Sequence, residues 1–301
     1  MKTGKHTVTA LTRQDSKASL PENVHVIKVN YDDESSIINA LKGQQFLVIT
    51  LAAGTTAKDV SGRIMTTAKK AGVHYIMPNA YGYPVEGDLN KPRQGDIYGE
   101  MVRHQILEAQ SGPTSSIALA CGFWYEFSLA MGERLFGFTL KDRKVTFFDD
   151  GKRKISVSTW SQCGRALAAL LSLPRSGQSN SLTDFKNKNV IVYSFSISQR
   201  DMLDSLNRVL GTTDTDWTIT YESSAKRIQE GHEELAKGVF IGFVKVLYGE
   251  IFLPSNNVSD YATTLSTSNS VLDLPKEDLD EATKRAVHLA ENSYVGYRHL
   301  S

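Results

Sequence analysis

The sequence predicts an α/β protein, in which a doubly wound parallel sheet is followed by a smaller α+β part. The first third of the chain alternates short β-type runs with helical stretches, and the connections between them are short. Residues 46–51 form a run with almost no polar side chain, which is typical of a strand covered on both faces. This repeated alternation indicates strands joined by helical crossovers, and therefore a parallel sheet.

Five strands and three helices are predicted before residue 122. Runs rich in β-branched and aromatic residues predict the strands, and stretches with helical periodicity predict the helices. Gly43 and Gly72 stand where a glycine commonly ends a helix, and Pro78 stops the fourth strand. The predicted strands are residues 7–11, 24–29, 46–51, 73–77 and 117–120, and the predicted helices are residues 35–41, 58–70 and 96–109.

The alternation changes after Gly122, which divides the chain into residues 1–122 and 123–301. The second part opens with an aromatic cluster at residues 123–127, and we expect its strand near residues 190–195 to return to the main sheet. The stretch 255–269 is rich in Ser and Thr and predicts a surface loop. The other predicted elements are a strand at 145–148, an edge strand at 217–221 and helices at 166–171, 225–237 and 274–291.

Two helix starts in the second part carry a recognisable signal. Thr159 and Gln162 stand at capping-box spacing, and so do Ser198 and Asp201. Such pairs satisfy backbone N–H groups that have no partner in the first helical turn. The sequence therefore predicts one helix after Thr159 and another that runs from Ser198 to Leu210.

Composition and charge exclude several classes of protein. The 301 residues hold 34 Lys and Arg against 33 Asp and Glu, which argues against a nucleic-acid-binding surface over the whole molecule. The longest apolar runs are far too short to span a bilayer, and no signal peptide opens the chain. The only two cysteines, Cys121 and Cys163, fit a reducing compartment and have no metal-ligand spacing. We therefore expect a cytoplasmic protein without a metal, a membrane anchor or bound nucleic acid.

The start of the chain lacks one expected feature. In a dinucleotide-binding fold the first strand leads into a glycine-rich turn at a helix start, which approaches the pyrophosphate. Here Gly4 is the only glycine before Gly43. The run 7–13 ends in Arg13, and Lys17 follows four residues later. A basic residue after the second strand suits a cofactor with a ribose 2′-phosphate, although ordinary solvated charge is the alternative for both side chains.

Four motifs occur in a characteristic order: Thr-Val-Thr-Ala-Leu-Thr-Arg at 7–13, the block 43–54, Ala-Gly-Val at 71–73 leading into 78–82, and Cys-Gly-Phe-Trp-Tyr-Glu at 121–126. Together they resemble the NmrA-like family, in its isoflavone reductase-like branch of the fungal type. The resemblance covers about residues 4–173. It implies an atypical short-chain dehydrogenase with a Rossmann-type NAD(P)-binding domain at 1–122, a substrate-binding part at 123–301 and a preference for NADPH.

The resemblance also implies that Met1 lies inside the first helix, so that the first strand and its glycine-rich loop are absent, as in a shortened gene product. In this fold that strand is central in the sheet. Its absence leaves unpaired backbone groups, each costing about 1–3 kcal/mol where buried. We therefore expect the chain to be poorly stable or rearranged at that place.

The resemblance assigns cofactor and substrate roles residue by residue. Arg13 and Lys17 match the clamp on the 2′-phosphate, with Thr12 beside them, and Asn30 lies near the adenine. The loop under the cofactor is Leu51, Ala52, Ala53 and Gly54, and the walls around the nicotinamide are Pro78, Asn79, Cys121, Gly122 and Phe123. The expected lining of an aromatic-friendly substrate pocket is Tyr81, Tyr83, Trp124 and Tyr125. The alternative for residues 123–127 is a cluster of core aromatics.

The sequence lacks the catalytic group that the resemblance leads us to expect. Reductases of the family carry a Lys on the helix before the fifth strand, where it reaches the substrate as a proton donor or oxyanion stabiliser. Residues 94–101 contain no Lys, and Tyr98 is the candidate proton donor there. The alternative for Tyr98 and Glu100 is a partly exposed helix residue, and His104 is expected at the surface.

The resemblance implies two alternative functions. The first is an NADPH-dependent reductase of a small, aromatic or phenolic secondary metabolite, acting as a monomer or homodimer. The second is a non-catalytic, NADP-binding redox sensor whose regulatory protein partner responds to cofactor occupancy, a role that tolerates loss of the Lys. A shortened product with neither activity is the third possibility.

Overall fold

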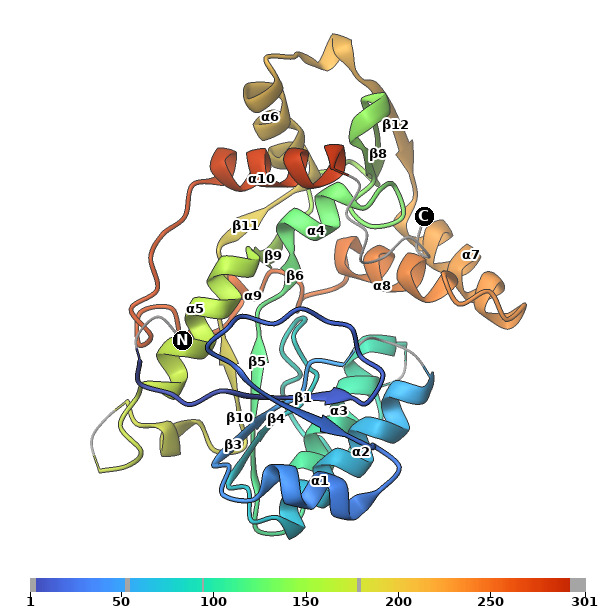
Figure 1. Ribbon diagram of the computed structural model, residues 1–301. Helices are drawn as coiled ribbons and strands as arrows, with labels where there is room; N and C mark the ends of the chain where they lie inside the picture. Colours follow the sequence, from blue (N-terminus) through green and yellow to red (C-terminus); the bar gives the residue numbers. More distant parts are fainter. Residues whose placement is uncertain (1–3, 52–54, 94, 178–179, 293–301) are drawn as a thin grey trace.

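A four-stranded parallel sheet forms the centre of the computed structural model, which describes residues 4–51, 55–93, 95–177 and 180–292, with the side chains of 55–59 left out. Its strand order is β10 (Lys188–Ile191), β5 (Ser115–Ala120), β4 (Tyr75–Met77) and β3 (Phe46–Val48). Every neighbouring pair in it is parallel. Figure 1 shows this sheet in the lower half of the molecule. The predicted parallel α/β fold is therefore confirmed, although β3 ends three residues earlier than expected.

Helices cover both faces of this sheet (Figure 1). Ile117 and Leu119 of β5 pack in one cluster with α5 (Trp160–Leu171), whereas Ala118 and Ala120 lie in another cluster with α3 (Ile97–Gln110). A third cluster joins α2 (Thr55–Lys70) to α1 (Glu34–Leu41) and β4. The alternation along β5 shows that it is buried on both faces, as its apolar sequence requires.

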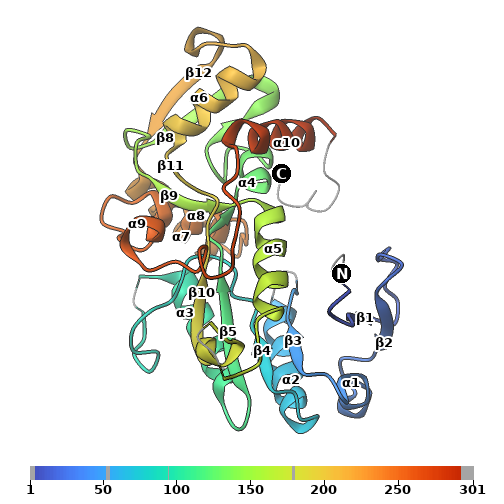
Figure 2. The ribbon, with the colours of Figure 1, turned by 90° about the vertical axis from the view of Figure 1, so that its left-hand side faces the viewer.

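The first two strands form a separate sheet. β1 (Thr9–Arg13) pairs in parallel with β2 (His25–Val29) over five residues. Within the described ranges, β1 pairs only with β2, and β3 pairs only with β4. Figure 2 shows β1, β2 and α1 set apart to one side of the other four strands. The break between the two sheets lies between β1 and β3, where the resemblance implies a further strand.

The second half of the chain builds two small sheets and a group of helices above the main sheet. One sheet is β11 (Phe195–Ile197), β9 (Ile155–Ser158) and β6 (Phe123–Trp124). The other is β12 (Thr218–Glu222), β8 (Lys144–Phe148) and β7 (Phe138–Thr139), which confirms β12 as an edge strand. The helices are α4 (Tyr125–Ala130), α6 (Gln199–Leu210), α7 (Ser224–Ala236), α8 (Gly242–Phe252), α9 (Tyr261–Thr264) and α10 (Leu279–Glu291), with short 3₁₀ turns at Leu140–Asp142, Leu182–Phe185 and Asp214–Asp216.

The two helix-start predictions have different outcomes. The pair Ser198 and Asp201 forms a complete capping box at the start of α6. Thr159 caps α5 by accepting a hydrogen bond from the Gln162 N–H at 2.9 Å. The Gln162 side chain does not complete the box, because its Oε1 accepts from Arg165 Nε at 2.9 Å and the Thr159 N–H donates to the Ser194 hydroxyl at 3.1 Å. The Thr159–Gln162 spacing therefore predicted the start of α5 correctly, although only the Thr159 side chain caps the helix.

Three sequence predictions are wrong in detail. The strand expected at 190–195 is two strands, β10 and β11, which belong to different sheets. The final helix begins at Leu279 after the N-cap Asp278, because the preceding segment with Pro275 is a loop. The expected surface loop at 255–269 contains α9, whose Tyr261 is fully buried. No described helix combines the length and apolar character needed to cross a bilayer.

Candidate functional site

The loops that follow β3, β4 and β5 meet at the carboxyl edge of the main sheet. Asn79 donates from Nδ2 to the carbonyl of Leu51 at 2.8 Å, and the Tyr81 hydroxyl donates to the carbonyl of Ile49 at 2.7 Å. The Gly122 N–H donates to the carbonyl of Gly82 at 3.0 Å. Ligands of open α/β sheets bind at this edge. The structure therefore brings Leu51, the loop after Pro78 and Cys121–Gly122 together, whereas Ala52, Ala53 and Gly54 lie outside the described residues.

Gly122 fixes the junction between β5 and the upper sheets. Its φ of +65° is unfavourable for any residue with a side chain. A Cβ atom there would also collide with the carbonyl oxygen of Ser156 in β9. A glycine is thus required at this position of the predicted nicotinamide wall.

Aromatic rings surround the next residue, Phe123. Its ring centroid lies 4.8 Å from that of Tyr248 and 6.5 Å from that of Tyr83. The Tyr83 hydroxyl donates to Asp96 Oδ1 at 2.5 Å, and burial followed by the Asp96 charge raises the pKa of Tyr83. Phe123 and Tyr83 are both buried, so this cluster is packed core behind the site edge.

The other two predicted substrate residues differ in exposure. Trp124 is half-buried, with its ring 6.2 Å from that of Phe127. Tyr125 is fully buried, and its hydroxyl lies 2.7 Å from the Thr283 hydroxyl of α10. Tyr125 therefore occupies the core between α4 and α10, while Trp124 stays accessible near the edge of the site.

Tyr98 is buried on α3 rather than partly exposed. Its hydroxyl oxygen accepts a hydrogen bond from the Gly82 N–H at 2.5 Å. Burial raises the pKa of Tyr98, so the phenol keeps its proton at neutral pH. Glu100 is half-buried, and its hydrogen bond with Arg103 lowers its pKa to about 2. His104 is exposed, as predicted.

The predicted cofactor residues on the separate sheet lie apart from this edge. Arg13 ends β1 and is exposed, 3.7 Å from the Asp15 carboxylate, and Lys17 is exposed as well. Asn30 is exposed, and its side chain accepts from the Asp32 N–H at 3.0 Å. Across the described residues, no hydrogen bond or ion pair joins Arg13, Lys17 or Asn30 to the loops after β3, β4 or β5.

One observation tests whether this group suits NADP(H). The hydroxyl oxygen of Thr12 is buried and has no hydrogen-bond partner. It lies beside Arg13, whose guanidinium is exposed. Together with the exposed cations Arg13, which also pairs with Asp15, and Lys17, this unsatisfied hydroxyl suits the 2′-phosphate end of NADP(H). Thr12, Arg13 and Lys17 therefore suit the adenosine end, whereas Phe123 belongs to the packed core, and Asn79 with Cys121–Gly122 lies at the sheet edge where the nicotinamide was expected.

The two cysteines come together although they are 42 positions apart. The Cys121 Sγ contacts the carbonyl of Tyr81 at 3.1 Å, and Cys163 on α5 packs in the same cluster. A hydrogen bond with Cys121, followed by burial, raises the pKa of Cys163 well above its usual range. The Cys163 thiol is therefore protonated at neutral pH. Among the described side chains, no group of three His, Cys, Asp or Glu could hold a metal ion.

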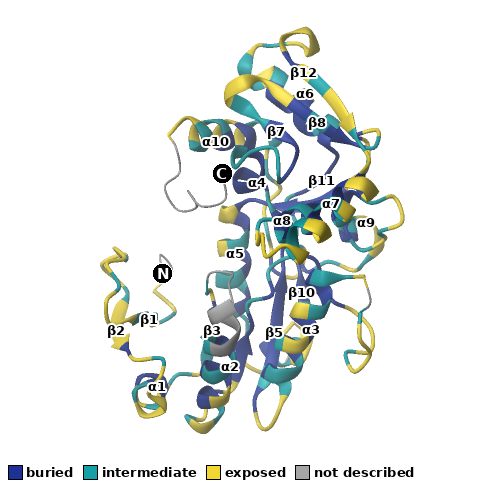
Figure 3. Cartoon of the chain, turned by 90° about the vertical axis from the view of Figure 1, so that its right-hand side faces the viewer, coloured by how far each residue is buried: buried dark blue, intermediate teal, exposed yellow. Residues whose placement is uncertain are grey.

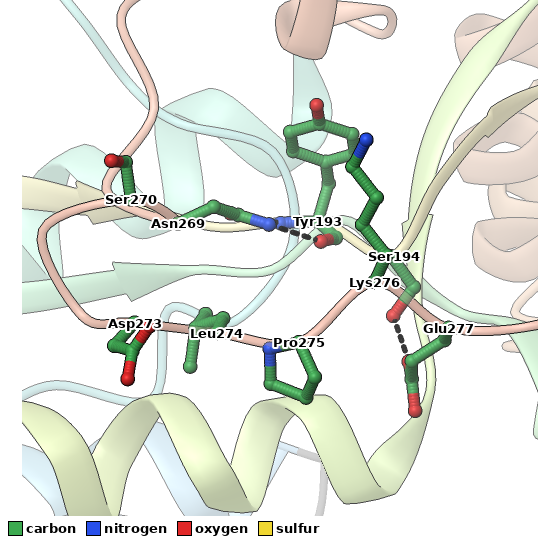
Figure 4. A pocket seen from close by; sticks show the side chains of 9 residues that line it. All are labelled: Tyr193, Ser194, Asn269, Ser270, Asp273, Leu274, Pro275, Lys276 and Glu277. Carbon is green, nitrogen blue, oxygen red and sulfur yellow. Dashed lines mark hydrogen bonds between the residues drawn. The ribbon is translucent and has the colours of Figure 1, made fainter.

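A pocket that the sequence did not predict lies beside this edge, directly after β10. It has a volume of about 450 Å³, and Tyr193 and Lys276 are among its lining residues (Figure 4). The residues come from two segments about 80 positions apart, the end of β10 and the loop before α10. No local pattern marks such a meeting, so only the fold reveals it.

Comparison with known proteins agrees with this geometry. A sequence family described as NAD(P)H-binding matches residues 1–110. No curated protein matches the sequence. A solved isoflavone reductase is 18% identical, with a TM-score of 0.67 over 94% of this chain and 92% of that one. An NADPH-dependent quinone oxidoreductase from Escherichia coli is 17% identical, with a TM-score of 0.60 over 93% and 90%.

A third similar structure is AtPrR2 with NADP+ and (+)pinoresinol, 17% identical, with a TM-score of 0.65 over 87% of this chain and 81% of that one. At such identities the structural likeness defines the fold. Residues 1–110 are therefore similar to an NAD(P)H-binding family, and the chain shares the α/β fold of these solved structures.

Proposed function

We propose that the protein is an NADPH-dependent reductase of a small aromatic or phenolic compound. The observation that carries the proposal is the carboxyl edge of the main sheet, where Asn79 and Tyr81 tie the loops after β3 and β4 together. The rigid junction at Gly122 then leads into half-buried Trp124. The NAD(P)H-binding family match over residues 1–110 supports a nicotinamide cofactor there.

Residues at two places in the chain would bind the two ends of the cofactor. Arg13 and Lys17 would hold the 2′-phosphate, since exposed cations favour a dianionic group over the hydroxyl of NADH. Asn79, Cys121 and Gly122 would border the nicotinamide, and Trp124 would present an aromatic surface to the substrate. The bound cofactor supplies the hydride.

Tyr98 stays the candidate proton donor in this proposal. Its oxygen accepts from the Gly82 N–H, so its own proton is free to point elsewhere. Its raised pKa keeps that proton in place until a stronger base forms on the substrate. Tyr98 would therefore act as an acid and never as a base at neutral pH.

One observation favours a second function, a non-catalytic NADP-binding redox sensor. Residues 94–101 contain no Lys, and Tyr98 is buried with its oxygen bonded to the backbone of Gly82. A protein with such a site could bind the cofactor without turning over a substrate. Its output would be a regulatory protein partner that binds in one cofactor state only.

Titration of protein fluorescence with NADPH and NADH tests cofactor binding. We expect micromolar NADPH binding and NADH binding at least about tenfold weaker, a difference of about 1.4 kcal/mol. Arg13→Gln should bring NADPH to the NADH level, whereas Lys144→Gln, at an exposed cation of β8, should change neither. Absence of binding by both nucleotides would reject the proposal, and equal binding of the two would reject the role of Arg13.

Turnover separates the two functions. NADPH consumption with quinones or phenolic enones, lost in Tyr98→Phe while NADPH still binds, would support the reductase. If no compound in such a panel is reduced and a protein partner binds only one cofactor state, the sensor is supported instead. Circular dichroism checks that Tyr98→Phe is folded, because this variant removes the acceptor of the Gly82 N–H.

A further inference from the structure

The pocket after β10 lies next to the predicted nicotinamide wall. The Val192 N–H donates to the carbonyl of Ala120 at 2.9 Å, so the chain leaves the sheet at Tyr193 beside Cys121. The Tyr261 hydroxyl donates to the carbonyl of Val192 at 2.8 Å, and a Cβ on Gly122 would lie 2.8 Å from the same hydroxyl. Tyr261 thus links the end of β10 to Gly122, and Tyr193 follows directly.

Hydrogen bonds at both ends fix the walls of this pocket. The Asn269 side chain accepts from the Tyr193 N–H at 3.1 Å and donates to the Tyr193 carbonyl at 2.8 Å. At the other end, the Glu277 carboxylate accepts from the hydroxyls of Ser194 at 2.5 Å and Thr159 at 2.8 Å. Figure 4 draws the Asn269–Tyr193 and Ser194–Glu277 bonds. A pocket held in this way does not have to be ordered when a ligand binds.

Two polar groups of the pocket have no partner among the described residues. The Lys276 ammonium makes no recorded ion pair or hydrogen bond, and neither does the Tyr193 hydroxyl. In Figure 4 the Lys276 ammonium and the Tyr193 hydroxyl project in the same direction, whereas the side chains of Asp273, Leu274 and Pro275 project the opposite way. Glu277 does not neutralise Lys276, because its carboxylate is bonded to Arg165, Thr159 and Ser194.

We propose that this pocket binds the carboxylate of an aromatic acid. Lys276 supplies the positive charge, the Tyr193 hydroxyl donates a hydrogen bond, and the apolar side chains of Leu274 and Pro275 line the same cavity. Its position beside Cys121 and Gly122 makes it the substrate's anionic subsite. That role rests on the proposed reductase function, whereas binding of the acid does not require the nucleotide.

Isothermal calorimetry with 4-hydroxybenzoate, in the absence of nucleotide, tests the pocket. The uncharged 4-hydroxybenzamide should bind at least about tenfold more weakly, and added salt should weaken the binding of the acid only. We expect Lys276→Gln to weaken benzoate binding about tenfold and Tyr193→Phe about threefold. Lys188→Gln, an exposed cation at the opposite end of β10, and Tyr221→Phe, an exposed tyrosine of β12, are matched controls that should bind as the unchanged protein does.

The outcomes distinguish this inference from the proposed function. Failure of the unchanged protein to bind 4-hydroxybenzoate, equal binding of the amide, or unchanged binding by Lys276→Gln would each overturn the pocket assignment, even where NADPH binds normally. If the unchanged protein binds 4-hydroxybenzoate through Lys276 but does not bind NADPH, the acid site is upheld. Its role as a reductase subsite is then overturned. NADPH affinity itself should be the same in Lys276→Gln.

Discussion

The molecule contains two parallel ladders of equal length whose surroundings differ. β1 pairs with β2 over five residues, and β8 pairs with β12 over five residues. Four of the five residues of β2 are exposed, whereas three of the five residues of β8 are buried. Figure 3 shows the same contrast in colour. The number of paired residues therefore does not determine how far the side chains of a strand are buried.

The β8–β12 ladder is stabilised by what covers it. Phe147 and Phe148 of β8 pack in the large cluster shared with α6 and α8. Arg227 of α7 lies 4.4 Å from the ring of Phe148 and pairs with Glu222 of β12 at 2.9 Å. In the β1–β2 ladder, Val29 is buried and Leu11 packs against the cluster of α1 and α2. A two-stranded ladder is marginal by itself, so the packed side chains decide its stability.

Removing the buried side chain of Arg227 should lower the stability at least as much as any other change proposed for the two ladders. Arg227 is 1% exposed and pairs with Glu133 and Glu222. Arg227→Met leaves both carboxylates without their partner, and because solvent screens part of their charge the free energy of unfolding should fall by about 2–3 kcal/mol. Urea unfolding followed by tryptophan fluorescence measures it, because Trp217 precedes β12 and is buried.

Arg13 in β1 provides the matched control. Its ion pair with Asp15 is exposed on both sides, so Arg13→Met should cost less than about 1 kcal/mol. Equal losses for Arg13→Met and Arg227→Met would show that the two ladders do not differ in the way their burial implies.

Glycine substitutions beside each ladder should have the next largest effect. Gly137, before β7, has a φ of +85°, and a Cβ there would collide with the carbonyl oxygen of Thr146 in β8. Gly137→Ala should cost about 2–3 kcal/mol, from the left-handed backbone and from the collision together. Gly4, before β1, has a φ of +64° with no atom near such a Cβ, and Gly4→Ala should cost at most about 1–2 kcal/mol. Thermal unfolding of the two variants gives the difference, which a similar loss at both positions would contradict.

The same substitution in the two ladders sharpens the comparison further. Val145 of β8 is 1% exposed, and Val26 of β2 is 47% exposed. Val145→Ala should cost about 2 kcal/mol through lost burial and the cavity it leaves, and Val26→Ala less than about 0.5 kcal/mol. Urea midpoints at equal slope measure both. A loss at Val26 as large as that at Val145 would mean that β2 is covered in solution.

The predictable part of the fold is the part with local signals. The apolar run in β3, the helix-ending Gly72 after α2 and the Ser198 cap of α6 each lie within a few residues of the element they mark. The helix α8 was not predicted, because buried residues such as Val244, Val246 and Tyr248 leave it without one polar face. Amphipathic periodicity indicates only helices that are half covered.

The candidate site likewise contains residues that the sequence pointed to and contacts that it did not. Leu51, Asn79 and Gly122 were assigned by the family resemblance, and they lie together because the carboxyl ends of neighbouring parallel strands share one edge. The contact of Cys121 with Cys163 and the pairing of Asn269 with Tyr193 join segments far apart in the sequence. Such contacts depend on how α5 and the loop before α10 fold back over the sheet, and no spacing in the sequence encodes them.

The helices packed beside the β8–β12 ladder bury the carboxyl group of Glu250, which should make the stability depend on pH. Glu250 lies on α8, which packs against α7, and its Oε2 atom is buried without a hydrogen-bond partner. Burial, and then the negative charge of Asp96, raises the pKa of Glu250 to about 7. The unfolded chain releases this proton near pH 4.5, the ordinary value, whereas the folded chain keeps it up to about pH 7.

The sign of the effect follows from these two values. Below pH 4.5 the Glu250 carboxyl is neutral in both the folded and the unfolded chain. Between pH 4.5 and 7 only the unfolded chain ionises, so the free energy of unfolding falls as the pH rises. Above pH 7 both states are ionised and the free energy of unfolding stays at its lowered value. Glu250→Gln should flatten this slope and raise the free energy of unfolding at pH 8 by about 1–2 kcal/mol, since solvent screens part of the effect. Urea unfolding at pH 5 and pH 8 measures it, with Glu281→Gln, at an exposed position of α10, as the control. A Glu250→Gln variant with the unchanged protein's pH slope would place the titrating group elsewhere.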